Sequence, residues 1–240
     1  MRVLVINPNT SAELTAAIDA AARRRARPDV EIVTKGAAWG PETVEGNYDE
    51  QLATVAMLEL VEEHAPGCDG VVIACFGDPG LYAAREVSPV PVVGIAEAAM
   101  LLACPLADRF SIVTILERMV PHLRHLVRFH GLDHRCASIR ATGCSVLDCT
   151  RDPAGTAAAT VAAARDAVAR DGAEAVVLGC SGMGGLEEAV RDALDVPVLD
   201  GTAAAVGLVA SLVDCGLRTS RAGAFMAPIA KPIRTRGAGR

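Results

Sequence analysis

The sequence predicts an α/β protein made of two similar Rossmann-like lobes, each with a parallel sheet. The lobes are expected to be related by pseudo-twofold symmetry, with the active site in the cleft between them. Short apolar runs alternate with helix-like segments along all 240 residues, a pattern that favours parallel sheets covered by helices. Of the residues 51% are hydrophobic but only 3% are aromatic, and an aliphatic core suits buried parallel strands. An internal repeat is the third observation.

The repeat consists of GCDGVVIACFGDPGL at 67–81 and GAEAVVLGCSGMGGL at 172–186. Each segment is an apolar run followed by Cys-x-Gly-x-x-Gly-Leu, so that Cys75 in the first half corresponds to Cys180 in the second. Core packing explains two valine-rich strands, but it gives no reason to repeat the cysteine and the glycines. Each half is therefore expected to place one cysteine just beyond the carboxyl end of a strand, where open parallel sheets bind ligands.

In the first half, apolar runs predict strands over 3–6, 30–34, 70–74 and 91–94. A helix over 12–25 follows the turn Asn-Pro-Asn-Thr-Ser, and Asn9 and Thr10 are alternatively only caps of that helix. A loop over 35–47 holds Trp39, which acts either as part of a lid or as an anchor of the loop. Apolar residues at helical spacing predict a helix over 50–64. A short helix follows Pro79, with Asp78 as its N-cap.

In the second half, the pattern predicts helices over 97–107, 120–129, 156–170, 186–194 and 202–215, and strands over 110–114, 137–140, 175–178 and 198–200. Residues 1–96 with 202–216 are expected to form the first lobe, 97–201 the second lobe, and 217–240 a C-terminal tail. His122, His125, His130 and His134 lie on or after one helix. We interpret them as a solvated helix face, because no carboxylate or cysteine spacing supports a metal cluster.

Composition excludes several classes of partner. The net charge of −6 leaves no broad basic field for nucleic acid, so a small neutral or anionic ligand is expected. No apolar stretch is long enough for a membrane span and none resembles a signal peptide, so a cytoplasmic protein is expected. The eight cysteines include no Cys-x-x-Cys pair, and we expect reduced thiols, most of them buried. Ala-rich helices predict self-association into a homo-oligomer.

Two thiols on opposite faces of an acidic C–H bond suit racemisation, because a thiolate can take a proton from one face while a thiol returns one to the other. A free thiol has a pKa of ~8.5, so the thiolate must be stabilised, and backbone N–H groups at a helix start can do this. Gly77 and Gly182 would let the backbone come close to a ligand. The charge of Asp78 opposes ionisation of Cys75, so Cys180 is expected to be the resting thiolate.

The motifs INPNT at 6–10, ACFGDPGL at 74–81 and VLGCSGM at 177–183 resemble the hydantoin racemase group of the aspartate/glutamate racemase superfamily, which includes allantoin racemases. The resemblance implies a cofactor-independent racemase of 5-substituted hydantoins or allantoin, with no metal and with Cys75 and Cys180 as the acid/base pair. It also implies a set of substrate-binding residues: Asn9, Val44, Phe76, Gly77, Thr114, Ile115, Ser181 and Gly182. Ile115 stands where relatives often carry a second Thr, which bears on the preferred 5-substituent.

Two alternatives remain open. The first is another enzyme of the same superfamily, namely an aspartate/glutamate racemase, a maleate-type isomerase or an arylmalonate decarboxylase. A one-thiol decarboxylase would need only the second cysteine, so the presence of both disfavours it. The second alternative is a non-catalytic, two-lobed protein that binds a small molecule, and such a protein would not need thiols at both equivalent strand ends.

Overall fold

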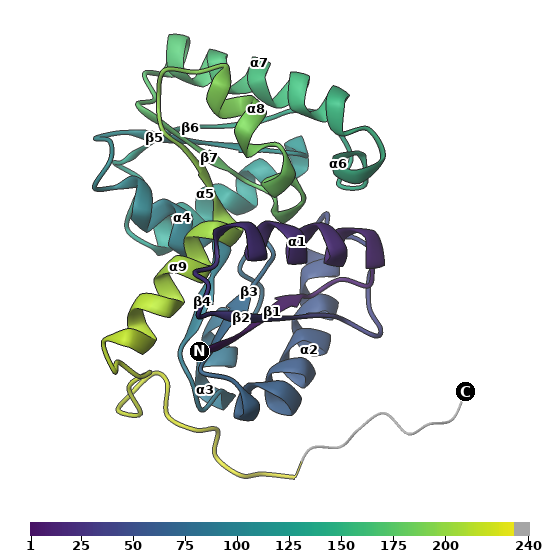
Figure 1. Ribbon diagram of the computed structural model, residues 1–240, viewed down its shortest axis with the longest axis vertical. Coiled ribbons are helices and arrows are strands. Elements are labelled where there is room, and N and C mark those ends of the chain that lie inside the picture. Colours follow the sequence, from purple (N-terminus) through teal and green to yellow (C-terminus); the bar gives the residue numbers. More distant parts are fainter. Residues whose placement is uncertain (233–240) are drawn as a thin grey trace.

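The computed structural model describes residues 1–232 and contains two four-stranded parallel sheets (Figure 1). The first sheet has the order β2-β1-β3-β4 and the second has the equivalent order β6-β5-β7-β8. Their strands are β1 (Arg2–Asn7), β2 (Glu31–Gly36), β3 (Gly70–Ile73), β4 (Val92–Gly94), β5 (Phe110–Thr114), β6 (Cys136–Ala141), β7 (Ala175–Leu178) and β8 (Val198–Asp200). The α/β class with two parallel sheets, predicted from the sequence, is confirmed.

Helices connect the strands and cover the sheets. They are α1 (Ala12–Arg25), α2 (Asn47–His64), α3 (Leu81–Val87), α4 (Ile95–Ala103), α5 (Val120–Phe129), α6 (Asp148–Arg151), α7 (Pro153–Asp171), α8 (Glu187–Asp192) and α9 (Gly201–Asp214). Three 3-10 turns, η1 (Ala65–Gly67), η2 (Glu117–Met119) and η3 (Ser181–Gly185), lie between them. The short helix α6 and the turn η3 were not expected from the sequence, because neither is long enough to show a period.

The repeated strands β3 and β7 are the centre of the two sheets. Every residue of GVVI in β3 and of AVVL in β7 is buried, because each strand has a neighbour on both sides and helices on both faces. β3 pairs with β1 and β4, and β7 pairs in the same way with β5 and β8. The repeated sequence therefore occupies equivalent places in the two sheets.

Two helices join the sheets into one core. α4 follows the last strand of the first sheet but also packs on β7 and β8, whereas α9 follows the last strand of the second sheet and packs on β1, β3 and β4. Gly70 makes room for this, because a Cβ there would lie 2.5 Å from a methyl group of Val209 in α9. In Figure 1, α4 lies against the second sheet where it meets the first, and α9 runs from that junction along the side of the first sheet. One cluster of buried side chains includes residues of both sheets, such as Val72 and Val177, together with α4 and α9.

The C-terminal segment is irregular as far as the structure describes it. Residues 217–232 form neither helix nor strand, and Arg221 fixes part of the segment by donating to backbone carbonyls of Arg85 and Glu86 at 2.9 Å. The remainder of the expected tail, 233–240, lies outside the described residues. Over residues 1–232, no helix combines the length and the apolar character that a membrane crossing requires.

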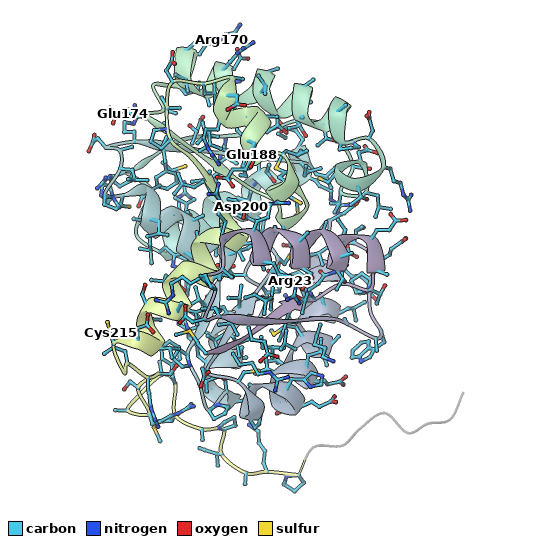
Figure 2. The ribbon with its side chains drawn as sticks, viewed as in Figure 1. Arg23, Arg170, Glu174, Glu188, Asp200 and Cys215 are labelled. Atoms are coloured by element: carbon cyan, nitrogen blue, oxygen red, sulfur yellow. The ribbon has the colours of Figure 1, made fainter. Side chains whose placement is uncertain are left out.

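The cysteines are free thiols, as expected, but their burial was predicted wrongly. Cys149 alone is buried, six others are partly exposed, and Cys215 is exposed at the end of α9 (Figure 2). The error arises because several cysteines end strands or begin loops, where the chain leaves the core.

Candidate active site

The two repeated cysteines follow the central strands at the carboxyl edge of each sheet. Cys75 is two residues beyond β3, and Cys180 is two residues beyond β7. In the sheet order β2-β1-β3-β4 the chain connections leave β1 and β3 in opposite directions, which opens a crevice between these strand ends. The same crevice exists between β5 and β7, and the two crevices face each other across one pocket.

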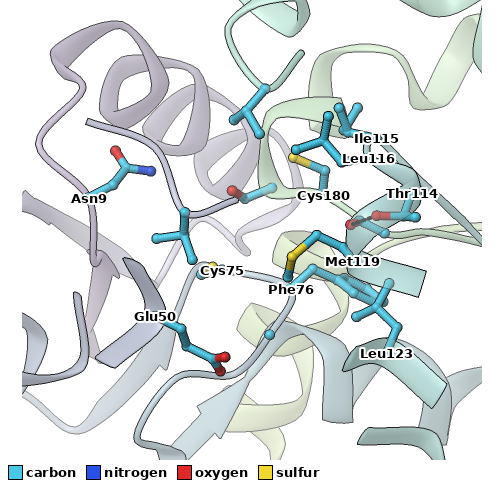
Figure 3. Close-up of a pocket in the computed structure, with 15 residues that line it drawn as sticks. Asn9, Glu50, Cys75, Phe76, Thr114, Ile115, Leu116, Met119, Leu123 and Cys180 are labelled. Atoms are coloured by element: carbon cyan, nitrogen blue, oxygen red, sulfur yellow. Dashed lines mark hydrogen bonds between the residues drawn. The ribbon is translucent and has the colours of Figure 1, made fainter. Parts of the chain in front are cut away.

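The pocket brings together residues from both halves of the chain (Figure 3). Free space within the pocket and its open mouth together is about 590 Å³. Nine of the ten residues that the sequence singled out line it: Asn9, Val44, Cys75, Phe76, Gly77, Thr114, Ile115, Cys180 and Ser181. The tenth, Gly182, does not line the pocket. It is buried behind Cys180, where a Cβ would lie 2.9 Å from the Cβ of Cys149.

Cys75 is held as a thiol. Burial raises the pKa of Cys75 to about 12, and the backbone N–H of Gly77, which donates to the sulfur, opposes this only in part. The charges of Cys180, Glu50 and Asp78 raise the pKa further. Cys75 is therefore protonated at rest, which is the form that can deliver a proton to a ligand.

Cys180 has the opposite tendency. A hydrogen bond from the Cys149 thiol lowers the pKa of Cys180, and the N–H groups of Gly182 and Met183 lower it too, against the effect of burial. η3 starts directly after Cys180, so the Gly182 N–H has no partner within the turn and is left for the sulfur. The Met183 N–H also donates to the Cys180 carbonyl at 3.0 Å, so it is shared between that oxygen and the sulfur. The two thiols thus differ in the direction expected from the sequence, although the main cause at Cys180 is a third cysteine.

Asp78 does not cap the helix that follows it, and this prediction was wrong. Its backbone is left-handed, with a φ of 48°, and its carboxylate accepts hydrogen bonds from the N–H groups of Ala96 at 3.0 Å and Glu97 at 2.7 Å. These groups begin α4, so Asp78 caps a different helix, while Gly80 precedes α3. Gly94 leaves the space, because a Cβ there would lie 2.2 Å from the Asp78 carboxyl carbon. Asp78 therefore ties the Cys75 turn to α4.

Asn9 and Thr114 occupy the ends of the other central strands. The Asn9 side-chain oxygen accepts from the Asn7 amide at 2.8 Å and from the Ser11 N–H at 3.0 Å, which leaves its amide nitrogen for a ligand. Ser11, rather than Asn9 or Thr10, caps α1. The Thr114 hydroxyl donates to the Gly179 carbonyl at 3.1 Å, so it links β5 to the residue before Cys180.

Some residues around the pocket carried no sequence signal. Glu50, Leu116, Met119, Leu123, Val146 and Gly179 also line it. In the sequence the apolar members resemble ordinary core positions, and Glu50 resembles a solvated helix residue. Val44 and Trp39 lie in the loop before α2, where the Trp39 indole donates to Glu59 of α2 at 2.7 Å, so Trp39 anchors the loop.

The histidines on α5 form no metal site in the described structure. Over residues 1–232, no three His, Cys, Asp or Glu side chains are grouped so that they could hold a metal ion. The interpretation of a solvated face is wrong for His122, which is partly buried with its Nδ1 3.5 Å from Glu50 Oε2. The turn η2 brings α5 against the pocket, which the helical period alone could not reveal.

Comparisons with known proteins agree with this architecture. A family model described as Asp/Glu/Hydantoin racemase matches residues 3–209. The hydantoin racemase of Pseudomonas sp. (strain NS671) is 42% identical over 229 residues, which cover 95% of this chain and 92% of that protein. The solved allantoin racemase from Klebsiella pneumoniae has a TM-score of 0.94 at 44% identity, covering 98% of this chain and 97% of that one. The allantoin racemase from Pseudomonas fluorescens has a TM-score of 0.95 at 41% identity, covering 98% and 100%.

Proposed function

The chain belongs to the Asp/Glu/hydantoin racemase family and is a racemase, and we propose that it racemises cyclic ureides, either 5-substituted hydantoins or allantoin, with Cys75 and Cys180 as its two bases. The observation that carries the proposal is one pocket lined by both repeated cysteines, whose surroundings drive their pKa values apart. The relatives named above as hydantoin racemase and allantoin racemase support the substrate class.

The reaction is a proton transfer in two half-steps. The Cys180 thiolate removes the proton from the ring α-carbon, forming an S–H bond and leaving the electron pair on the ring. The Cys75 thiol then delivers its proton to the opposite face of the same carbon and becomes the thiolate. The product is the mirror image of the substrate, and the two sulfurs have exchanged protonation states. No oxidant, metal or organic cofactor takes part in this scheme.

Backbone N–H groups next to the cysteines can stabilise the intermediate. Removal of the α-proton places negative charge on the neighbouring ring carbonyl oxygen, and donors aimed at such an oxygen lower the barrier. Phe76 and Ser181 both line the pocket. Ser181 opens η3, so its N–H has no acceptor within that turn. We assign these two N–H groups to the ring carbonyls, and the Asn9 amide nitrogen to a carbonyl further along the ring.

The apolar side of the pocket is assigned to the 5-substituent. Val44, Ile115, Leu116, Met119 and Val146 surround it, and an apolar wall of this kind favours a hydrocarbon substituent through burial. Ile115 stands where relatives often carry a Thr next to the one equivalent to Thr114, so the wall of this pocket has one hydroxyl group fewer. Between allantoin and 5-substituted hydantoins, the loss of a polar group from the wall favours hydantoins with an apolar 5-substituent.

An isotope experiment tests the proposal. The protein is incubated in D₂O with one enantiomer of allantoin or of several 5-alkyl and 5-aryl hydantoins, with aspartate and glutamate as comparison substrates. We expect loss of optical rotation together with entry of one deuterium at the α-carbon, faster than in protein-free buffer. Exchange with aspartate or glutamate alone would favour an amino-acid racemase, and exchange with none of them would contradict the proposed substrate class.

Three expectations accompany the proposal. We propose that residues 1–96 with 202–216 and residues 97–201 are the two lobes, since α4 and α9 each pack on the sheet of the other half. We also propose that the protein works in the cytoplasm and that it forms a homo-oligomer. Exposed side chains of Tyr48, Leu52 and Val55 on one side of α2 fit self-association, which light scattering of the purified chain would test.

A further inference from the structure

The two repeated glycines face different surroundings. A Cβ built on Gly182 would lie 3.1 Å from the Cys149 sulfur and 3.3 Å from a methyl group of Leu14. A Cβ on the equivalent Gly77 would instead lie 3.2 Å from His122 Nε2 and 3.3 Å from Glu50 Oε1. The backbone is repeated, but a thiol and an apolar side chain back the turn of Cys180, whereas a carboxyl and an imidazole back the turn of Cys75.

Glu50 and His122 form a buried acid–imidazole pair. Glu50, on α2, is 8% exposed and lines the pocket, and Figure 3 shows it below Cys75. Its Oε2 lies 3.5 Å from Nδ1 of His122, which comes from α5 in the other half of the chain. Burial raises the pKa of Glu50 to about 7 and lowers the pKa of His122. Burial therefore favours the uncharged form of both groups.

The pair is poorly suited to a purely structural role. The contact between the two side chains is long, and the buried Nε2 of His122 faces the Gly77 backbone without forming a hydrogen bond of good geometry within residues 1–232. A structural pair between two helices is normally well satisfied, because an unpaired buried polar atom costs stability. Arg85 and Glu97 in this chain show such a pair, joined at 2.5 Å with the guanidinium also bonded to a backbone carbonyl at 3.1 Å. The contrast points to a functional role for Glu50, which lines the pocket, and for His122, whose Nε2 lies beside Gly77 in the turn of Cys75.

We propose that Glu50 and His122 are positioning residues for Cys75, with the acid form of Glu50 keeping negative charge away from the sulfur while Cys75 becomes the thiolate. In the half-step in which Cys75 acts, its S–H bond breaks, a C–H bond forms on the substrate and the electron pair stays on sulfur. A carboxylate near that sulfur would oppose this charge, whereas an uncharged carboxylic acid, 3.5 Å from His122 Nδ1, does not. The inference rests on the proposed function for its place in the reaction.

Other charged groups near these residues define the controls. Cys75 is faced by Cys180, Glu50 and Asp78, and His122 is faced by His125. On the α2 side, the Arg118 guanidinium lies against Gly46, and Asp49 accepts from the Glu45 N–H. Asp78 is the main competitor, because burial raises its pKa to about 7 as well. The Asp78 carboxylate, however, accepts hydrogen bonds from the N–H groups that begin α4. Substituting Asp78 and Glu50 one at a time therefore distinguishes their effects on Cys75.

Thiol alkylation tests the inference without any substrate. In the full chain carrying Cys180→Ser, the rate at which iodoacetamide modifies Cys75 is followed from pH 5.5 to 9.5 by peptide mass spectrometry, with and without Glu50→Gln. We expect equal rates below about pH 6, where Glu50 is protonated, and roughly three- to tenfold faster modification in the Glu50→Gln variant above pH 8. Glu62→Gln, the same change on an exposed residue of α2, should leave the profile unchanged.

Two further variants sharpen the result. His122→Leu removes the imidazole whose Nδ1, 3.5 Å from the Glu50 carboxyl, can accept from its acid form, so the pH at which the two rates separate should fall. The inference would be overturned if the alkylation rates of the chains with and without Glu50→Gln changed in parallel with pH. It would also be overturned if Asp78→Asn, and not Glu50→Gln, produced the rate difference above pH 8. Because alkylation needs no ureide, this outcome is independent of the isotope experiment, and either proposal can fail while the other stands.

Discussion

At the scale of single residues, neighbours decide whether a repeated cysteine works as an acid or as a base. The backbone supplies each sulfur with at least one N–H donor, from Gly77 for Cys75 and from Gly182 and Met183 for Cys180. What differs is the side chain behind each turn. A thiol donor favours the thiolate of Cys180, whereas burial without such a donor favours the thiol of Cys75. The asymmetry that decides which sulfur rests as the thiolate therefore comes from positions outside the repeat.

The first prediction concerns the order of labelling. Alkylating agents react with the thiolate, and the pKa of Cys180 is lowered while that of Cys75 is raised to about 12. We expect iodoacetamide at pH 7 to modify Cys180 in the Cys75→Ser chain faster than it modifies Cys75 in the Cys180→Ser chain. Raising the pH should narrow the difference, since Cys75 then begins to ionise. Equal rates at pH 7 would contradict the assignment.

The second prediction concerns Cys149. Its thiol donates to Cys180, and a hydrogen bond to a charged group is worth about 1.5–3 kcal/mol. We expect Cys149→Ala to slow alkylation of Cys180 at pH 7 on the order of tenfold, measured in the Cys75→Ser chain. Cys144→Ala, in the same segment, is the matched control. A rate that recovers as the pH rises would identify a lost donor, whereas a rate unaffected by the substitution would rule the donor out.

At the scale of elements, Asp78 shows how a turn residue can hold two helices in place. A helix start has N–H groups without partners, and a carboxylate from elsewhere in the chain can satisfy them. Asp78 does so for α4, bonding Ala96 and Glu97 at once. The Cys75 turn is thereby fixed to the helix that connects the two sheets, which positions the cysteine relative to the opposite half.

The third prediction follows from this cap. Asp78→Ala leaves two buried N–H groups without an acceptor, so we expect the free energy of unfolding to fall by about 1–3 kcal/mol, measured by urea denaturation. Asp78→Asn keeps one acceptor oxygen and should lose less. Asp152→Ala removes a local cap of α7, at the exposed Gly155 N–H, and serves for comparison. If Asp78→Ala were as stable as the parent chain, the cap would have no energetic role.

The elements themselves follow closely from local sequence signals. Strands such as Gly70–Ile73 and Ala175–Leu178 were visible as short valine-rich runs ending at a cysteine. The helix over 12–25 was predicted with the same bounds, because a turn precedes it and Pro28 follows it. Asp78 was misassigned because Asp-Pro at this spacing also begins ordinary helices. Only the arrival of α4 beside the turn, a contact between distant residues, reveals its role.

At the scale of the whole molecule, the pocket exists because two equivalent crevices are held face to face. The repeat of Cys75 and Cys180 was enough to predict that both sheets contribute to one site. Glu50 and Met119, which line the pocket, and Cys149, which donates to Cys180, were not predictable, since all three come from segments outside the repeat. Their place depends on how α4 and α9 set the sheets relative to each other, and that is a property of packing rather than of any local pattern.

The fourth prediction tests whether this packing makes the chain a single folding unit. Met100 of α4 is fully buried in the core that includes both sheets, whereas Met57 of α2 is fully buried in a separate cluster beside the first sheet. Each Met→Ala change should lower the free energy of unfolding by about 2–5 kcal/mol. Because the shared core links the sheets, both variants should shift one and the same transition.

Two probes read this out in urea. The chain has a single tryptophan, Trp39, whose indole is bonded to α2 and reports on the first sheet and its helices, while far-UV circular dichroism reports on the whole chain. Coincident curves for both probes, in the parent and in both variants, are expected if α4 and α9 couple the halves. Two separate transitions, with Met57→Ala moving only the one that Trp39 follows, would show that the halves unfold independently and that the cleft is held by a weaker contact than the shared core implies.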